Sequence, residues 1–226
     1  MEQSVAGELD GPRLEAKSGK AKNVVVFLHG YGADGNDLID IGRTWQDILP
    51  DTAFVSPHAP RICGQSPTGR EWFALTFRDP TERWRGVNEA APVLNTFVDA
   101  ELTRRQLPPN AYALVGFSQG TMMSLQVGLR RATAPKAIVG YSGMLVTPHE
   151  EKDVEPFMQG ITAKPPVLLI HGDQDPLIPV QAVLQASQGL AAMDIPAEWH
   201  ISPGVGHGID EEGLRHGGEF LARALR

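Results

Sequence analysis

The sequence predicts an α/β fold: an open, mostly parallel, doubly wound sheet with helices on both faces and no large cap domain. Short apolar runs alternate with longer amphipathic stretches along most of the chain, which is typical of doubly wound sheets. The first five runs are almost continuously apolar, as strands buried on both faces must be. Because 226 residues fit one domain, we predict a single domain over residues 1–226, with residues 1–22 either partly disordered or an edge strand.

Six apolar runs predict the strands: Asn23–Leu28, Ala53–Ser56, Tyr112–Val115, Ala137–Tyr141, Val167–Ile170 and Glu198–Ile201. Amphipathic stretches predict five helices: Asp37–Ile48, Pro92–Arg105, Gln119–Arg131, Val180–Ala191 and Ile209–Leu225. The last helix has three carboxylates in its first turn and Arg223 near its end, as the helix dipole favours.

Residues 57–80 show no clear hydrophobic periodicity and are rich in proline and glycine. Long loops inside compact domains are usually functional or mobile, so we expect this segment to form a wall over a site. Ligands of doubly wound sheets bind beyond the carboxyl ends of the strands. Functional residues are therefore expected directly after the strands.

The charge balance and the single cysteine exclude several functions. Twenty basic against 27 acidic side chains give a net charge of −7, and the arginines are scattered, so no nucleic-acid partner is expected. With Cys63 alone, neither an intrachain disulfide nor a multi-thiolate metal site can form. Residues 1–22 are polar without a signal-peptide pattern, and the apolar runs are too short to span a bilayer. We expect a cytoplasmic protein without stable membrane insertion.

A G-x-S-x-G motif follows the third predicted strand. Gly116, Ser118 and Gly120 stand between that strand and a helical stretch, which is the context of a nucleophile elbow. The glycines remove Cβ atoms that would collide across so sharp a turn, and Ser118 is held in a strained conformation beyond the strand end. The alternative is a tight turn whose serine only caps the helix.

A serine hydroxyl needs a base and an orienting carboxylate to attack at neutral pH. His207 lies in a glycine-flanked loop between the last strand and the last helix. Asp173 and Asp175 both follow the strand Val167–Ile170, and either is a candidate carboxylate or a turn residue. The order Ser, Asp, His is that of α/β-hydrolases.

Four other histidines are interpreted as structural or solvent-exposed residues. His58 and His149 neighbour prolines, His200 lies within a strand and His216 lies within the last helix. His207 is therefore the preferred base.

Acyl transfer also needs two N–H groups directed at the developing oxyanion. In this fold one comes from the residue after the nucleophile and one from the loop after an early strand. We predict Gln119 N–H as the first donor and Tyr31 N–H as the second. The alternative for the loop around Tyr31 is a simple glycine turn leading into a helix.

These motifs resemble the phospholipase/carboxylesterase family of serine hydrolases, whose eukaryotic members include the acyl-protein thioesterases. The similarity extends from about Asn23 onward, and its matching pieces are Phe27–Gly30, Gly116–Gly120, His171-Gly172, Asp175–Pro179 and Gly206-His207. The resemblance implies Asp175 as the carboxylate, because the family's aspartate precedes the proline, and it also implies Tyr31 as the second donor. Ser142-Gly143 looks like the family's Ser-Gly pair at that strand end.

Two departures from the family bear on the substrate. In thioesterase-like members a Trp-Phe pair is followed by aspartate, whereas Ala74 follows Trp72-Phe73 here, and the loop has an extra segment around Arg61–Arg70. The cysteine after the initiator methionine, which can be lipidated in eukaryotic relatives, is replaced by Glu2. These differences favour a bacterial-type carboxylesterase over a protein depalmitoylase.

The predicted reaction is two-step hydrolysis of a carboxylic ester through an acyl-enzyme on Ser118, without a metal ion or organic cofactor. The expected substrate is a small-molecule or lipid ester, and the expected assembly is a monomer or homodimer. Acyl-thioester or lysophospholipid hydrolysis with the same residues is one alternative, and a catalytically silent binding protein is another. Five apolar residues are candidates for the acyl pocket or the core: Trp72, Phe73, Met144, Leu145 and Leu177.

Overall fold

The computed structural model describes residues 9–76 and 78–226. Within them, one large sheet contains β1 (Arg13–Leu14), β2 (Asn23–Leu28), β3 (Thr52–Val55), β6 (Tyr112–Phe117), β7 (Ala137–Tyr141), β8 (Val167–Gly172) and β9 (Ala197–Ser202). A separate hairpin consists of β4 (Arg61–Cys63) and β5 (Ser66–Glu71). The helices are α1 (Asn36–Trp45), α2 (Glu82–Arg104), α3 (Gln119–Gly128), α4 (Glu151–Gln159), α5 (Gln181–Ala192) and α6 (Glu211–Ala224).

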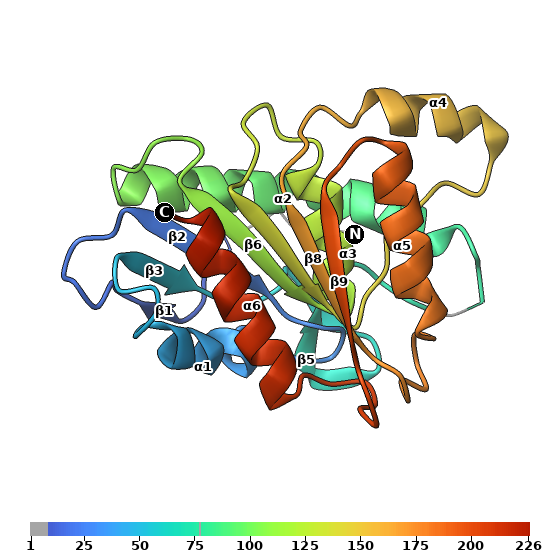
Figure 1. Cartoon of the computed structure of the whole chain (residues 1–226). Helices are drawn as coiled ribbons and strands as arrows, with labels where there is room; N and C mark the ends of the chain where they lie inside the picture. Colours follow the sequence, from blue (N-terminus) through green and yellow to red (C-terminus); the bar gives the residue numbers. More distant parts are fainter. Residues whose placement is uncertain (1–8, 77) are drawn as a thin grey trace.

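The large sheet has the strand order β1-β3-β2-β6-β7-β8-β9 (Figure 1). Every neighbouring pair is parallel except β1 with β3. The chain builds outward from β2 to β3 in one direction and from β6 to β9 in the other, so the order reverses between β2 and β6. Ligand sites of doubly wound sheets lie at such a reversal. The predicted α/β-hydrolase fold is confirmed.

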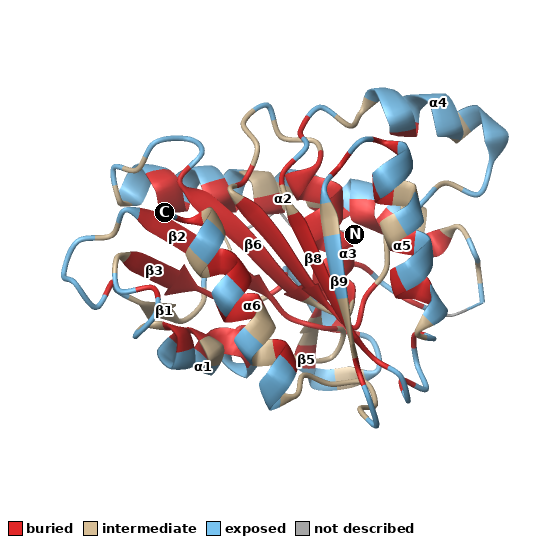
Figure 2. Ribbon diagram, viewed as in Figure 1, coloured by how far each residue is buried: buried red, intermediate tan, exposed pale blue. Residues whose placement is uncertain are grey.

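Helices cover both faces of the sheet (Figure 1). Alternate residues of β2 divide between the two faces: Val25 and Phe27 pack with α1 and α6, whereas Val24 and Val26 pack with α2 and α3. Figure 2 shows the central strands buried throughout and the outer surfaces of the helices exposed. Burial on both faces is the reason for the continuously apolar strand sequences.

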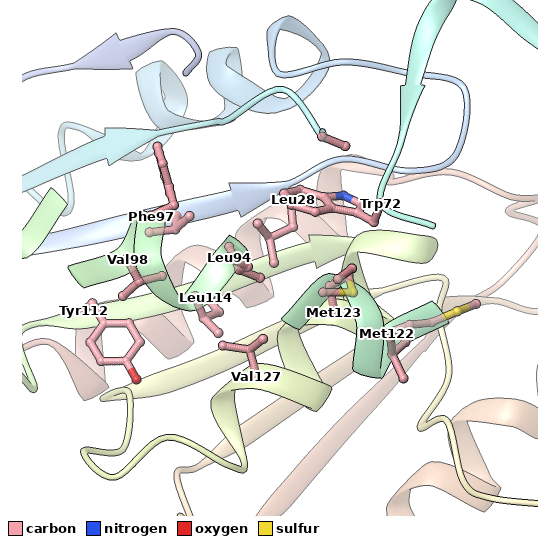
Figure 3. Packing of buried hydrophobic residues seen from close by; sticks show 14 of the residues in the cluster. Leu28, Trp72, Leu94, Phe97, Val98, Tyr112, Leu114, Met122, Met123 and Val127 are labelled. Atoms are coloured by element: carbon pink, nitrogen blue, oxygen red, sulfur yellow. The ribbon is translucent and has the colours of Figure 1, made fainter. Parts of the chain in front are cut away.

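Trp72 joins the core of the α2–α3 face (Figure 3). It lies beside Leu28, the last residue of β2, and the same cluster contains Met123 of α3 and Leu94 of α2. The long segment between β3 and α2 therefore contributes large side chains to the interior.

Three elements differ from the sequence prediction. The segment expected as a loop contains the β4–β5 hairpin, whose strands mix exposed and buried residues and lack an apolar pattern. Helix α2 begins at Glu82 instead of Pro92, and Pro92 lies in its interior, although a proline more often marks the first turn of a helix. Helix α4 was not predicted, because it buries only Phe157 and contains Pro156.

The N-terminal segment places β1 at the edge of the sheet, where Arg13 and Leu14 pair with Val55 and Phe54. Residues 1–8 of the segment predicted as disordered or an edge strand lie outside the described residues. In the described part of the chain, no helix combines the length and the apolar character needed to cross a membrane.

Candidate active site

Ser118 forms the sharp turn between β6 and α3. Its φ of 54° and ψ of −114° are strained for a residue with a side chain, at a cost of about 1–3 kcal/mol. A Cβ atom at Gly120 would lie 1.8 Å from Leu28 O, so only glycine lets α3 start this close to β2. Ser118 occupies the N-cap position of α3, but its side chain makes no capping hydrogen bond, so its hydroxyl is not used to cap the helix.

His207 contacts Asp175 across the carboxyl ends of β8 and β9. His207 Nδ1 lies 2.7 Å from Asp175 Oδ2. A carboxylate oxygen accepts, so Nδ1 carries a proton, and in the neutral imidazole the lone pair is then on Nε2. Asp173, the other candidate, is exposed and accepts instead from Gly204 N at 2.7 Å.

The carboxylate of Asp175 is held by further donors. Its Oδ1 accepts from Leu177 N and Ile178 N, both at 2.9 Å. Burial acts to raise the pKa of Asp175, but the hydrogen bonds from Ile178 N, His207 and Leu177 N outweigh burial and hold that pKa below its usual value. Asp175 is therefore a fixed anion at neutral pH.

A second histidine approaches the same carboxylate. His171 Nε2 lies 2.8 Å from Ile178 O and 3.3 Å from Asp175 Oδ2. Because a carbonyl oxygen only accepts, His171 Nε2 carries a proton and donates it to Ile178 O. The sequence prediction used His171 only as part of a family motif and assigned it no contact.

The loop that carries His207 contacts the carboxyl ends of the neighbouring strands β7 and β8. A Cβ at Gly172 would lie 2.2 Å from Val205 O, so glycine lets the loop pass directly over the end of β8. Ser142 Oγ, after β7, donates to Gly208 O at 3.2 Å. These contacts restrict the position of the imidazole.

Ser118 and His207 both follow carboxyl ends of strands of the large sheet, and the residue before Ser118 contacts His207. The ring of Phe117, the residue before Ser118, lies 5.0 Å from the imidazole of His207 between centroids. Among the described residues, no hydrogen bond joins Ser118 Oγ to His207, and such contacts often tighten only when substrate is bound.

The loop predicted to supply the second oxyanion donor is paired with the β4–β5 hairpin. Gly32 N donates to Arg70 O at 2.9 Å, and Arg70 N donates to Ala33 O at 2.7 Å. A Cβ at Gly69 would lie 2.0 Å from Gly32 O. Burial, followed by a contact with Cys63, raises the pKa of the neighbouring Tyr31 hydroxyl. The extra segment of the sequence thus supports this loop.

His29 anchors the start of the same loop. It is fully buried, and its Nε2 accepts from Ala59 N at 3.0 Å. Nδ1 therefore carries the proton and donates to Gly30 O at 2.8 Å. Burial lowers the pKa of His29 to about 4, so the side chain is neutral at pH 7.

The side chain of Gln119 has a role that the sequence did not reveal. Its Oε1 accepts from Trp72 N at 2.9 Å, and its Nε2 donates to Phe73 O at 2.8 Å. Trp72 Nε1 in turn donates to His29 O at 3.0 Å. The residue after the predicted nucleophile thus connects the segment between β3 and α2 to residues 29–33, the loop that is predicted to supply the second oxyanion donor and is called the oxyanion loop below.

The five predicted pocket residues are dispersed. Trp72 and Phe73 are only 1% and 3% exposed and belong to the core. Met144 and Leu145 are partly buried and pack against the core, whereas Leu177 is 70% exposed. Their contact with an acyl chain stays a prediction.

Two cavities adjoin the site, and none of those five residues lines them. One of about 340 Å³ is lined by Asp37, Leu38, Ile41, Phe117, Gly208, Ile209 and Leu214. The other, of about 470 Å³, lies beside the oxyanion loop and shares Asp37. Burial and the nearby Asp34 raise the pKa of Asp37. A larger cavity of about 800 Å³ lies between α1 and α6, away from Ser118.

The strand order and the strained serine at the β6–α3 turn are those of an α/β-hydrolase. Residues 9–225 match the phospholipase/carboxylesterase family, and the chain belongs to that family of serine hydrolases. The resemblance inferred from the motifs is confirmed.

Three relatives illustrate the range of similarity. The solved structure of esterase PE8 is 45% identical, covers 97% of this chain and 100% of its own, and has a TM-score of 0.91. Acyl-protein thioesterase 1 of Gibberella zeae is 27% identical over 89% of this chain and 90% of its own length. Esterase YpfH of Escherichia coli is 24% identical over 86% of this chain and 80% of its own.

Proposed function

We propose that this chain hydrolyses carboxylic esters, with Ser118 as nucleophile, His207 as general base and Asp175 as the orienting carboxylate. The observation that carries the proposal is the 2.7 Å contact between His207 Nδ1 and Asp175 Oδ2. It fixes the tautomer in which Nε2 is the basic nitrogen, as removal of the serine proton requires.

In the first step His207 Nε2 takes the proton of Ser118 as Oγ attacks the carbonyl carbon. Asp175 stabilises the imidazolium that forms, and the tetrahedral oxyanion accepts from the N–H groups of Tyr31 and Gln119. Gln119 is the first residue of α3, where the N–H has no partner inside the helix and the dipole favours negative charge.

The imidazolium then gives its proton to the leaving alcohol, and an ester joins the acyl group to Ser118. Water then attacks the acyl carbonyl carbon while His207 takes its proton. The imidazolium returns that proton to Ser118 Oγ as the bond to the acyl group breaks, which releases a carboxylic acid and free Ser118. Every proton is transferred through His207, and the chain itself supplies the nucleophile, the base and the oxyanion donors.

A carboxylic ester is the proposed substrate class because the similarity to esterase PE8, at 45% identity, exceeds that to the acyl-protein thioesterase, at 27%. Thioester or lysophospholipid hydrolysis by the same residues is the alternative. We further propose that the chain acts as a monomer or homodimer in the cytoplasm, and that the cavity beside Phe117 and Gly208 receives one part of the substrate.

The test is a hydrolysis panel of p-nitrophenyl esters from acetyl to palmitoyl, with matched thioesters and a lysophospholipid. The ester series is expected to be turned over fastest, and Ser118→Ala should abolish turnover while retaining the wild-type melting temperature. Ser187→Ala, a partly buried serine on α5, is the matched control and should keep full activity. Thioesters faster than every ester would favour the alternative, and a folded wild type without any turnover would indicate a binding protein.

A further inference from the structure

We propose a binding site for a zinc-class divalent metal ion, formed by His200, Glu212 and His216 outside the catalytic residues. His200 lies on β9, whereas Glu212 and His216 lie on α6. One ligand atom from each side chain lies within 4.8 Å of those of the other two. Glu212 and His216 are four residues apart, the spacing that places two side chains on one face of a helix.

One ring nitrogen of His200 is buried without a hydrogen-bond partner. Its Nε2 is buried and has no hydrogen bond from any described residue, and buried polar atoms without a partner are rare and costly. The rings of His200 and His216 lie 4.3 Å apart between centroids, with 38° between their planes. A metal ion is an acceptor of nitrogen lone pairs and would satisfy the orphaned nitrogen.

The donor set selects the class of ion. Two imidazoles and one carboxylate suit Zn²⁺, Cu²⁺ or Ni²⁺, whereas Mg²⁺ and Ca²⁺ prefer oxygen ligands alone. Tetrahedral Zn²⁺ with bonds of about 2.0–2.1 Å needs ligand atoms about 3.3 Å apart. His216 Nε2 and Glu212 Oε1 are already 3.6 Å apart, and the widest separation in the cluster, at most 4.8 Å, has to contract by up to about 1.5 Å. Glu212 is free to rotate because its side chain is 52% exposed.

Arg215 competes with the ion in the unbound state. Its guanidinium lies 3.3 Å from His216 Nε2 and 3.6 Å from Glu212 Oε1. It also pairs with Glu219 at 3.0 Å, so it can leave the cluster without losing every partner. Removal of this cation should strengthen metal binding.

An ion at this position would join β9 to α6. The connecting residues 203–210 carry His207, so the cross-link would span the two ends of the loop that holds the proposed base. Binding to the folded chain alone raises its stability, and a rise in melting temperature with Zn²⁺ is the expected consequence.

The test is calorimetric titration of the chelator-treated full chain with Zn²⁺, alongside thermal denaturation. The wild type is expected to bind one ion, with a higher melting temperature in Zn²⁺ and no change in Mg²⁺. His216→Ala and Glu212→Gln should each weaken binding by about 10- to 100-fold or more, because even partners outside the ligand shell contribute that much. Arg215→Ala should bind more tightly than the wild type.

His149→Ala is the matched control, since it removes an exposed histidine remote from the cluster in sequence, and its affinity should equal that of the wild type. The proposal is overturned if the wild type shows no saturable binding at millimolar Zn²⁺. It is also overturned if both His216→Ala and Glu212→Gln bind Zn²⁺ as the wild type does, or if Mg²⁺ binds equally well. Because each readout is binding or stability, the result is independent of esterase activity.

Discussion

Gly69→Ala tests whether the β4–β5 hairpin positions the oxyanion loop. The added methyl carbon would lie 2.0 Å from Gly32 O, whereas such carbons essentially never come closer than 3.0 Å to another heavy atom. Its other near neighbours are Gly32 C and Gly32 Cα, so backbone has to move by about 1 Å. The residue before Gly32 is Tyr31, whose N–H is the proposed donor.

The expected loss follows from that displacement. A misplacement of about 1 Å can reduce a rate by about 10²-fold, which corresponds to about 2.7 kcal/mol of transition-state stabilisation. Complete loss of one oxyanion donor costs about 10²–10³-fold in kcat. We therefore expect Gly69→Ala to lower kcat by one to two orders of magnitude. The melting temperature should fall as well, because Gly69 is buried and its new methyl group meets backbone.

The assay is steady-state hydrolysis of a p-nitrophenyl ester, with the melting temperature measured on the same samples. Gly64→Ala is the matched control, because it lies in the same hairpin and a Cβ there meets nothing within 4 Å. A Gly69→Ala protein with wild-type kcat would refute the positioning argument. An equal loss in Gly64→Ala would refute it as well.

Three further predictions follow from the buried polar contacts. Asp175→Asn should lower kcat by about 10⁴-fold, because an amide no longer fixes the His207 tautomer. Asp173→Asn should keep the wild-type rate. A loss of rate in Asp173→Asn but not in Asp175→Asn would make Asp173 the orienting carboxylate. Gln119→Ala leaves Trp72 N and Phe73 O without their hydrogen-bond partners. Its free energy of unfolding, measured by urea denaturation, should be lower by about 2–4 kcal/mol. A variant as stable as the wild type would contradict the role of this side chain. The pKa of His29 is about 4 in the folded chain, against an ordinary value of 6.5. Between these pH values His29 is therefore protonated in the unfolded chain and neutral in the folded chain. Stability should therefore fall by up to about 3 kcal/mol as the pH drops from 6.5 toward 4, and His29→Gln should remove that part of the pH dependence; identical slopes for both proteins would contradict the assignment.

The chemistry at the strand ends was predictable because it is encoded locally. Gly116 and Gly120 flank Ser118 within five residues, and each glycine meets backbone that excludes a side chain. Asp175 follows the buried strand β8 and His207 follows the partly exposed edge strand β9, and parallel strands bring their carboxyl ends to one edge of the sheet. The choice between Asp173 and Asp175 needed the family resemblance, because both follow the same strand.

The supporting contacts were not predictable in the same way, since they join segments distant in sequence. The β4–β5 hairpin has no apolar pattern, and its pairing partner is the loop at Gly32 and Ala33, not the apolar sheet. The contact of Gln119 with Trp72 spans 47 residues and leaves no periodic signal. His200 and His216 were treated separately as a strand residue and a helix residue, and only the packing of α6 on β9 brings their rings together.

Covalent labelling shows directly whether Ser118 is the nucleophile. The wild-type chain is treated with a fluorophosphonate and analysed by intact-mass and peptide mass spectrometry. One adduct per chain on Ser118 is predicted, with none on Ser118→Ala and much slower labelling of His207→Ala. A folded chain that hydrolyses esters but has its adduct on another residue, or none, would contradict the account.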